Sequence, residues 1–192
     1  VYNPEPIADF FDMFYIGEGE VQYRPLFDLY KKCKKNGESR EAFLRKAAQI
    51  PGIYVPSLYD VTYNEDGTII DFTPVDNSIP ATIEKQVVLD MTEATYPEKP
   101  LVPFIKVTQD RVVLEIQRGC SRGCRFCQAG QIYRLVRERD AKKLKEYAVK
   151  LLKATGHEEI SLSSLSSSDY SQLEEVINYL IDECNKRYVN IS

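Results

Sequence analysis

The 192-residue sequence lacks any apolar run long enough to cross a bilayer, and no charged segment followed by an apolar one opens it. We therefore expect neither a membrane span nor an export signal. The sequence also lacks an excess of positive charge, because 25 Lys and Arg residues face 29 Asp and Glu residues and the formal net charge is −4. This balance argues against a generally basic surface for nucleic acid. Hydrophobic residues make up 43% of the chain, enough to form a core.

Cysteine does not occur as an even set spread along the chain, which is the pattern of a secreted disulfide framework. There are five cysteines, and three of them crowd into positions 120–127. We therefore expect a reducing, cytoplasmic location and thiolates that bind metal. The chain begins at Val1, and its last residues, Val189-Asn190-Ile191-Ser192, resemble a strand that is cut short. We expect a piece of a longer protein.

The first 105 residues divide into two stretches of different character. Residues 1–50 predict a strand over 10–16, a tight turn and two helices, the second of which is capped by Ser39. Residues 51–105 are extended and rich in proline, and the turn at 64–67 predicts a β-hairpin. We interpret 51–105 as a connector. The first helix has an apolar face formed by Leu26, Leu29, Tyr30 and Cys33.

Residues 106–192 alternate between strand and helix patterns. A strand over 111–117 is followed by a helix capped by Asp140 and ended at Gly156, and then by a strand over 159–163. The sequence Ser171-Gln172-Leu173-Glu174 predicts a capping box for the next helix, and a third strand begins near Tyr188. This order is typical of a parallel α/β sheet or barrel, of which only the first units are present.

The most informative segment is the C-x3-C-x2-C spacing of Cys120, Cys124 and Cys127, on the loop after the first of these strands. Loops at the carboxyl ends of parallel strands carry the reactive groups of such folds. Gly119 and Gly123 let the backbone turn tightly, so that three sulfurs can point at one centre. Three thiolates can each bind one iron of a 4Fe–4S cube and leave the fourth iron open. Between residues 117 and 139, six arginines face one acid, a local charge of +5 that suits an anionic cluster.

With Phe126 as its aromatic residue, C-x3-C-x-aromatic-C resembles the signature of the radical S-adenosylmethionine (SAM) superfamily. The resemblance implies a partial (β/α) barrel in which Cys120, Cys124 and Cys127 bind a 4Fe–4S cluster. It implies reductive cleavage of SAM to methionine and a 5′-deoxyadenosyl radical, with Phe126 near the adenine and flavodoxin or ferredoxin as the electron donor. The turn after the second strand departs from the usual Gly-Gly-Glu form and is similar to the methylthiotransferase-like branch. By that resemblance the SAM contacts include the hydroxyls of Ser164, Ser166 and Ser168.

The same branch implies methyl or methylthio transfer and an RNA or protein substrate. The sequence Arg137-Glu138-Arg139 is similar to an arginine-containing segment of this branch, although a solvated helix start is an alternative. The opening segment 3–20 resembles the end of the Rossmann-like cobalamin-binding domain that precedes many radical SAM barrels, so residues 1–50 are expected to be the C-terminal tail of such a domain. Cobalamin is therefore a further expected cofactor of the longer protein. The chain as a whole is similar to an internal piece of an uncharacterised B12-binding-domain-containing radical SAM protein.

Two other readings of the cysteine loop stay open. A structural zinc site needs four ligands, so Cys184 or the single histidine, His157, would complete the three cysteines. A thiol–disulfide redox protein would use Cys124 and Cys127 alone. On the first strand, Glu115 and Gln117 share one face, which predicts that both line the reaction chamber or that Glu115 points outward and pairs with a helix lysine.

Overall fold

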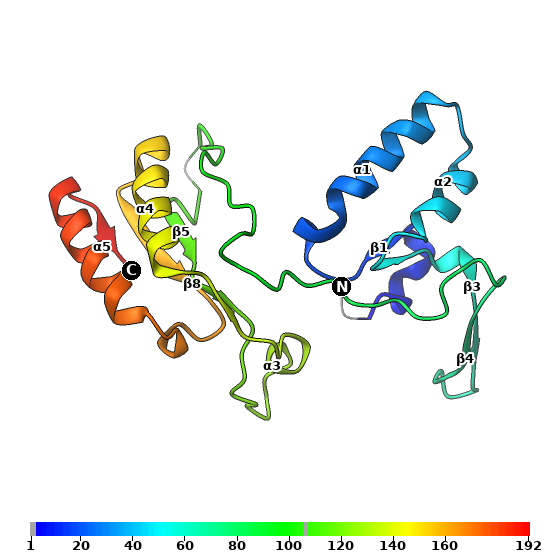
Figure 1. Cartoon of the computed structure of the whole chain (residues 1–192). Helices are drawn as coiled ribbons and strands as arrows, with labels where there is room; N and C mark the ends of the chain where they lie inside the picture. Colours follow the sequence, from blue (N-terminus) through cyan, green and yellow to red (C-terminus); the bar gives the residue numbers. More distant parts are fainter. Residues whose placement is uncertain (1–2, 106) are drawn as a thin grey trace. The chain divides into compact units, whose positions relative to one another are not determined.

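A computed structural model describes residues 3–105 and 107–192, and the chain divides between Val88 and Leu89 into two compact units (Figure 1). The predicted connector, 51–105, is therefore shared between the units. Its hairpin belongs to the first unit, and its last part belongs to the second. Lys106, the first residue of the predicted barrel segment, and residues 1–2, which open the predicted N-terminal domain, lie outside the described residues. No described helix is long and apolar enough to cross a membrane.

The N-terminal unit contains short strands, two α-helices and a hairpin, which can be followed in Figure 1. As predicted, Ser39 caps the second helix, because its Oγ accepts a hydrogen bond from the Ala42 N–H at 3.2 Å. The hairpin pairs antiparallel strands, with Val61 opposite Phe72. In chain order the elements are η1 (Glu5–Phe10), β1 (Phe14–Tyr15), α1 (Gly19–Lys35), α2 (Arg40–Ala47), β2 (Ile53–Tyr54), η2 (Pro56–Leu58), β3 (Tyr59–Tyr63) and β4 (Ile69–Pro74).

The predicted strand over 10–16 is wrong for most of its length. Only β1, Phe14–Tyr15, pairs as a strand, and Phe10 is the last residue of the 3₁₀ helix η1. Pro6 lies in the first turn of η1, where its fixed φ suits a helical start. Phe10 and Phe11 are exposed, so the apolar run that predicted a strand is not a buried run.

The C-terminal unit is built on a three-stranded parallel sheet in the order β5-β8-β9. Helix α4 follows β5 and helix α5 follows β8, as the alternation of patterns predicts (Figure 1). The elements are β5 (Val112–Glu115), β6 (Gln117–Arg118), α3 (Ala129–Ile132), β7 (Arg137–Glu138), α4 (Ala141–Thr155), β8 (Glu159–Ser163), η3 (Ser167–Asp169), α5 (Leu173–Arg187) and β9 (Asn190–Ile191).

The ends of α4 are confirmed, and the start of α5 is corrected. The Asp140 carboxylate accepts from the first backbone N–H groups of α4, and Gly156 ends that helix at a φ of +71°. The capping box at Ser171 is wrong, because α5 begins at Leu173 without a side-chain cap. The N–H and Oγ of Ser171 instead donate to the carboxylate of Glu138. A partner distant in the sequence therefore replaces the local one.

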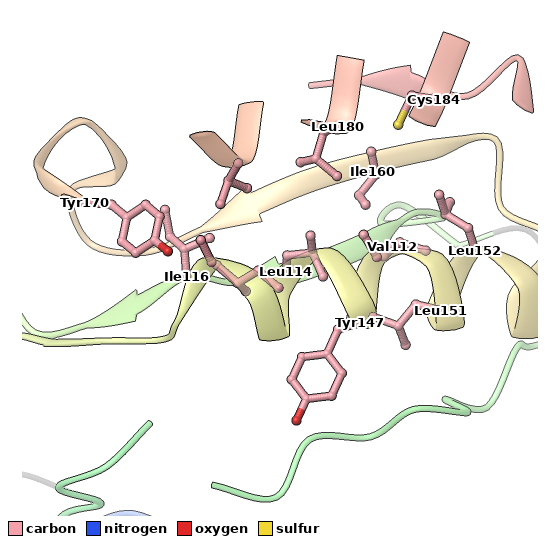
Figure 2. Close-up of a cluster of buried hydrophobic side chains, with 14 residues drawn as sticks. Val112, Leu114, Ile116, Tyr147, Leu151, Leu152, Ile160, Tyr170, Leu180 and Cys184 are labelled. Atoms are coloured by element: carbon pink, nitrogen blue, oxygen red, sulfur yellow. The ribbon is translucent and has the colours of Figure 1, made fainter. Parts of the chain in front are cut away.

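The core of this unit joins one face of β5 to both helices. Figure 2 shows side chains from β5, β8, α4 and α5 converging on a continuous apolar cluster. Leu114 and Ile116 are completely buried, and Cys184 contributes a small apolar side chain from α5. The sheet is thereby fixed against its helices, and the loops at the carboxyl ends of β5 and β8 meet at one edge.

Within the C-terminal unit, a buried arginine holds the segment 91–96 against the sheet. The Arg139 guanidinium is fully buried and donates to the backbone carbonyls of Met91 and Ala94 at 2.5 and 3.5 Å. It also lies over the rings of Tyr96 and Tyr147, 4.8 and 5.6 Å from their centroids. The alternative of a solvated helix start is therefore wrong for Arg139, whose role is to fix the segment 91–96 against the sheet.

Candidate metal centre and its neighbouring turn

The three clustered cysteines lie on a long loop between two short paired strands, β6 and β7. Strands β6 and β7 pair antiparallel at its base, with Arg118 opposite Arg137. Above this base, the Cys120 N–H donates to the Tyr133 carbonyl at 2.8 Å. The two ends of the cysteine loop are therefore held together, and all three cysteines lie between the paired strands.

Gly119 is the tightest point of this base. Its φ is +87°, and a Cβ placed there would lie 2.0 Å from the Leu135 carbonyl oxygen. Only glycine combines this backbone conformation with such a close approach. Gly123 also has a positive φ, +69°, so both glycines predicted to turn the loop do so.

The loop thiols are free and accessible. Cys124 is exposed, Cys120 and Cys127 are half-buried, and none of the three is in a disulfide. The Cys127 N–H donates to the Cys124 carbonyl at 3.0 Å, which forms a turn between these two residues. Phe126, on the same turn, is 93% exposed.

In the described conformation the thiols do not converge. Among residues 3–105 and 107–192, no three His, Cys, Asp or Glu side chains lie close enough together to hold a metal ion. The loop therefore supplies three sulfur donors within eight positions, but metal binding requires them to turn toward a common centre. Thiolates are the ligands that iron–sulfur clusters use, so the donor chemistry fits the expected cluster.

The fourth ligands considered for a zinc site lie elsewhere. Cys184 is 1% exposed within the core, and the His157 Nδ1 lies 3.3 Å from an Asp110 carboxylate oxygen. His157 precedes β8, whereas the cysteine loop follows β5, which runs parallel to β8. His157 and the cysteine loop therefore lie at opposite ends of the parallel strands. Neither Cys184 nor His157 completes a zinc site with the loop in this fold.

The positive charge of the loop segment is partly balanced by acids from outside it. Two Arg118 nitrogens donate to the Glu115 carboxylate at 2.8 and 2.9 Å, and the Arg139 Nη2 lies 3.7 Å from the same group. Glu115 thus pairs with arginines, and the prediction of a helix lysine as its partner is wrong. The arginine count alone did not reveal these pairs, because the Arg139 partner lies 24 positions from Glu115 and is brought close only by the fold.

The serine-rich turn after β8 has its own hydrogen-bond network. The hydroxyls of Ser164 and Ser167 are 2.9 Å apart, and the Ser166 N–H donates to the Ser164 Oγ at 3.2 Å. The Ser166 Oγ donates to Asp169 at 2.7 Å, whereas Ser168 is exposed. The turn therefore presents a mixture of bonded and exposed hydroxyls beside the loop.

Two residues that the sequence did not single out for this purpose connect the turn to the loop. Arg122 forms a two-pronged ion pair with Asp169, with an Nε–Oδ2 distance of 2.7 Å. Hydrogen bonds from Arg122 and then Ser166 lower the pKa of Asp169 to about 2. The buried Gln117 donates from its Nε2 to the Ser166 carbonyl at 2.8 Å. The only sequence signal was the proximity of both residues to Cys120.

Comparisons with known proteins match both ends of the chain to one superfamily. Residues 1–56 match the family model for radical SAM proteins, N-terminal, and residues 114–192 match the model for the radical SAM superfamily. The uncharacterized protein MJ0966 of Methanocaldococcus jannaschii is 27% identical over 186 residues. That alignment covers 92% of this chain and 32% of the relative, so the chain spans about a third of that protein. No solved structure gave a significant match.

Two segments of this chain are therefore similar to radical SAM domains, one N-terminal and one core. The matched core family is one whose members have a β/α fold and use a 4Fe–4S cluster and SAM.

Proposed function

We propose that this chain, two segments of which are similar to radical SAM domains, binds a 4Fe–4S cluster through Cys120, Cys124 and Cys127 for the reductive cleavage of SAM. One observation carries the proposal. Three free thiols share one loop at the carboxyl edge of the parallel sheet, whereas the other two cysteines are buried. Such a division is expected when one set binds a cofactor and the other fills space.

The donor set determines what this site can do. Three thiolates satisfy three irons of a cube and leave the fourth iron open to a small molecule. When bound, the cluster supplies the electron that splits the sulfonium bond of SAM. The protein contributes the thiolates, the closed base of the loop and the sheet edge that positions both.

The SAM contacts are proposed from the same edge. Phe126, 93% exposed, offers an uncovered ring for the adenine. The hydroxyls of Ser164, Ser166 and Ser168 can accept hydrogen bonds from an ammonium group and donate them to a carboxylate. The hydrogen bond from the Ser166 N–H to the Ser164 Oγ keeps these two residues of the turn close together.

The partners of the longer protein are further proposals. A flavodoxin or ferredoxin would supply the electron, and methyl or methylthio transfer to RNA or protein would follow. Exposed cationic side chains such as Arg125 support a polyanionic partner, although several neighbouring arginines are committed to acids. The similarity of segment 3–20 to the end of a cobalamin-binding domain supports an association with cobalamin. Cobalamin retention by the longer protein during gel filtration would test that association.

Anaerobic reconstitution with ferrous salt and sulfide tests the cluster directly. We expect the wild-type chain to turn brown and to hold about four irons and four sulfides, the content of one cube. Replacing Cys120, Cys124 or Cys127 by serine removes most of this iron, whereas Cys33→Ala and Cys184→Ala serve as matched controls that keep it.

Two outcomes would contradict the proposal. A colourless chain that retains zinc in preference to iron would identify a zinc module. A chain that takes up no iron but reduces disulfides through Cys124 and Cys127 would identify a thiol redox protein.

A further inference from the structure

Arg122 connects two segments that are far apart in the sequence. It lies between Cys120 and Cys124 on the loop, and its Nε and Nη2 donate to the two carboxylate oxygens of Asp169, 47 positions later. The guanidinium of a loop residue therefore faces the carboxylate of the serine-rich turn.

A second contact reaches the same turn from the other side of Cys120. The Gln117 side chain is buried, and its Nε2 holds the Ser166 carbonyl at 2.8 Å. Ser166 in turn donates from its Oγ to Asp169 at 2.7 Å. The turn is thus attached at two points, and both attachments come from the segment that carries Cys120.

We propose that Arg122 and Asp169 are positioning residues, which shape the serine-rich turn for SAM according to the conformation of the cysteine loop. The identity of the ligand rests on the proposed function, but the coupling of the two segments does not. Neither residue is proposed to touch the reacting atoms. A change in the loop that moves Arg122 releases Asp169, and the hydrogen bond from Ser166 to Asp169 is then no longer held in place.

The physical reason for such a device lies in the composition of the turn. Serine side chains can bond to many nearby backbone groups, so a turn of consecutive serines has several conformations of similar free energy. A bidentate arginine–carboxylate pair fixes direction as well as distance, and it favours one of these conformations. Arg122 is 61% exposed, so the pair contributes little to global stability and its main effect is local order.

Hydrogen–deuterium exchange of the metal-free wild-type chain tests the coupling without any cofactor. We expect Arg122→Ala and Asp169→Asn to speed exchange of the backbone amides at 164–169 by about threefold to fivefold, the range that an exposed ion pair contributes. The matched control is Arg45→Ala in the N-terminal unit, because Arg45 pairs with Asp76 at 2.7 Å and Ser78 also donates to Asp76. That variant leaves exchange at 164–169 unchanged.

The reconstituted chain supplies the second readout. The affinity for SAM is measured from the change in the spectrum of the cluster. We expect the dissociation constant to rise about threefold to fivefold in Arg122→Ala, while the iron content stays at the wild-type level. The double variant Arg122→Asp with Asp169→Arg restores part of both effects, because the ion pair is rebuilt with its charges exchanged.

Unchanged exchange at 164–169 in both single variants would overturn the proposal. Loss of iron from Arg122→Ala would also overturn it, since Arg122 would then act on the cluster rather than on the turn. If the wild-type chain takes up no iron, the proposed function fails alone, and the exchange result still decides whether the two segments are coupled.

Discussion

The apolar core of the C-terminal unit and the cysteine loop both contain cysteine, but the exposure of the thiols differs between them. Cys184 is 1% exposed among the side chains of α5 and β8, and burial raises the pKa of its thiol. On the loop, Cys124 is exposed and Cys120 and Cys127 are half-buried. Burial suppresses the thiolate form, whereas an accessible thiol can reach a metal or a reagent. The contrast teaches that environment, more than residue type, separates a packing cysteine from a candidate ligand.

Thiol alkylation should show the largest difference between the two regions. In the metal-free chain at pH 8, iodoacetamide is expected to modify Cys120, Cys124 and Cys127 about a hundredfold or more faster than Cys33 and Cys184, which must first become exposed by local unfolding. The pKa of Cys33 is raised by burial and then by a hydrogen bond with Glu38. Peptide mass spectrometry over time measures each rate, and equal rates for all five cysteines would remove the contrast.

A core truncation should cost far more stability than a loop truncation. Leu114 is fully buried on β5, so Leu114→Ala is expected to lower the free energy of unfolding by about 2–5 kcal/mol. Phe126 is 93% exposed, and Phe126→Ala should change that free energy by less than about 0.5 kcal/mol. Urea unfolding followed by circular dichroism measures both, and a large loss from Phe126→Ala would show that the ring packs against the protein.

Glycine replacements sharpen the comparison inside the loop. Gly119 and Gly156 both have positive φ values, +87° and +71°, but only at Gly119 would an added Cβ meet backbone atoms, those of Leu135 and Val136. We expect Gly119→Ala to destabilise the chain by about 1–3 kcal/mol more than Gly156→Ala does, because the backbone must shift to relieve the overlap. Thermal unfolding of the two variants measures the difference. Equal losses would indicate that the base of the loop yields easily.

Acid should produce the smallest effect, at an exposed ion pair of the N-terminal unit. Hydrogen bonds from Ser78 and then Arg45 lower the pKa of Asp76 from 3.8 to about 2. A lowered carboxyl pKa means that the native state favours the charged form. Its contribution to stability is present above about pH 4 and is lost as the pH falls toward 2. Asp76→Asn should flatten that part of the stability profile, and an unchanged profile between pH 4 and 2 would contradict this assignment.

Local patterns predicted the elements that local interactions determine. Asp140 and Gly156 delimit α4 as their residue types indicate, and the hairpin turns at 64–67 as predicted. The capping box at Ser171 failed because Glu138, 33 positions away, takes both of its donors. Sequence periodicity contains no information about a partner at that distance.

The candidate site divides in the same way. Gly119 and the three loop cysteines were visible from spacing alone, because the motif is contiguous. The burial of Arg139 and the Arg122–Asp169 pair were not, since each depends on segments that only the fold brings together. The placement of the thiols around a metal also remains a prediction, because no three candidate ligands among the described residues converge in this conformation.

The most direct test of the central claim is an electron paramagnetic resonance spectrum of the anaerobically reconstituted chain, recorded after reduction with dithionite and then after addition of SAM. We expect the signal of a reduced 4Fe–4S cluster. The signal should change when SAM binds and should be absent from a variant with Ser in place of Cys120, Cys124 and Cys127. A wild-type chain that gives no such signal, or one whose signal survives the triple substitution, would contradict the central claim.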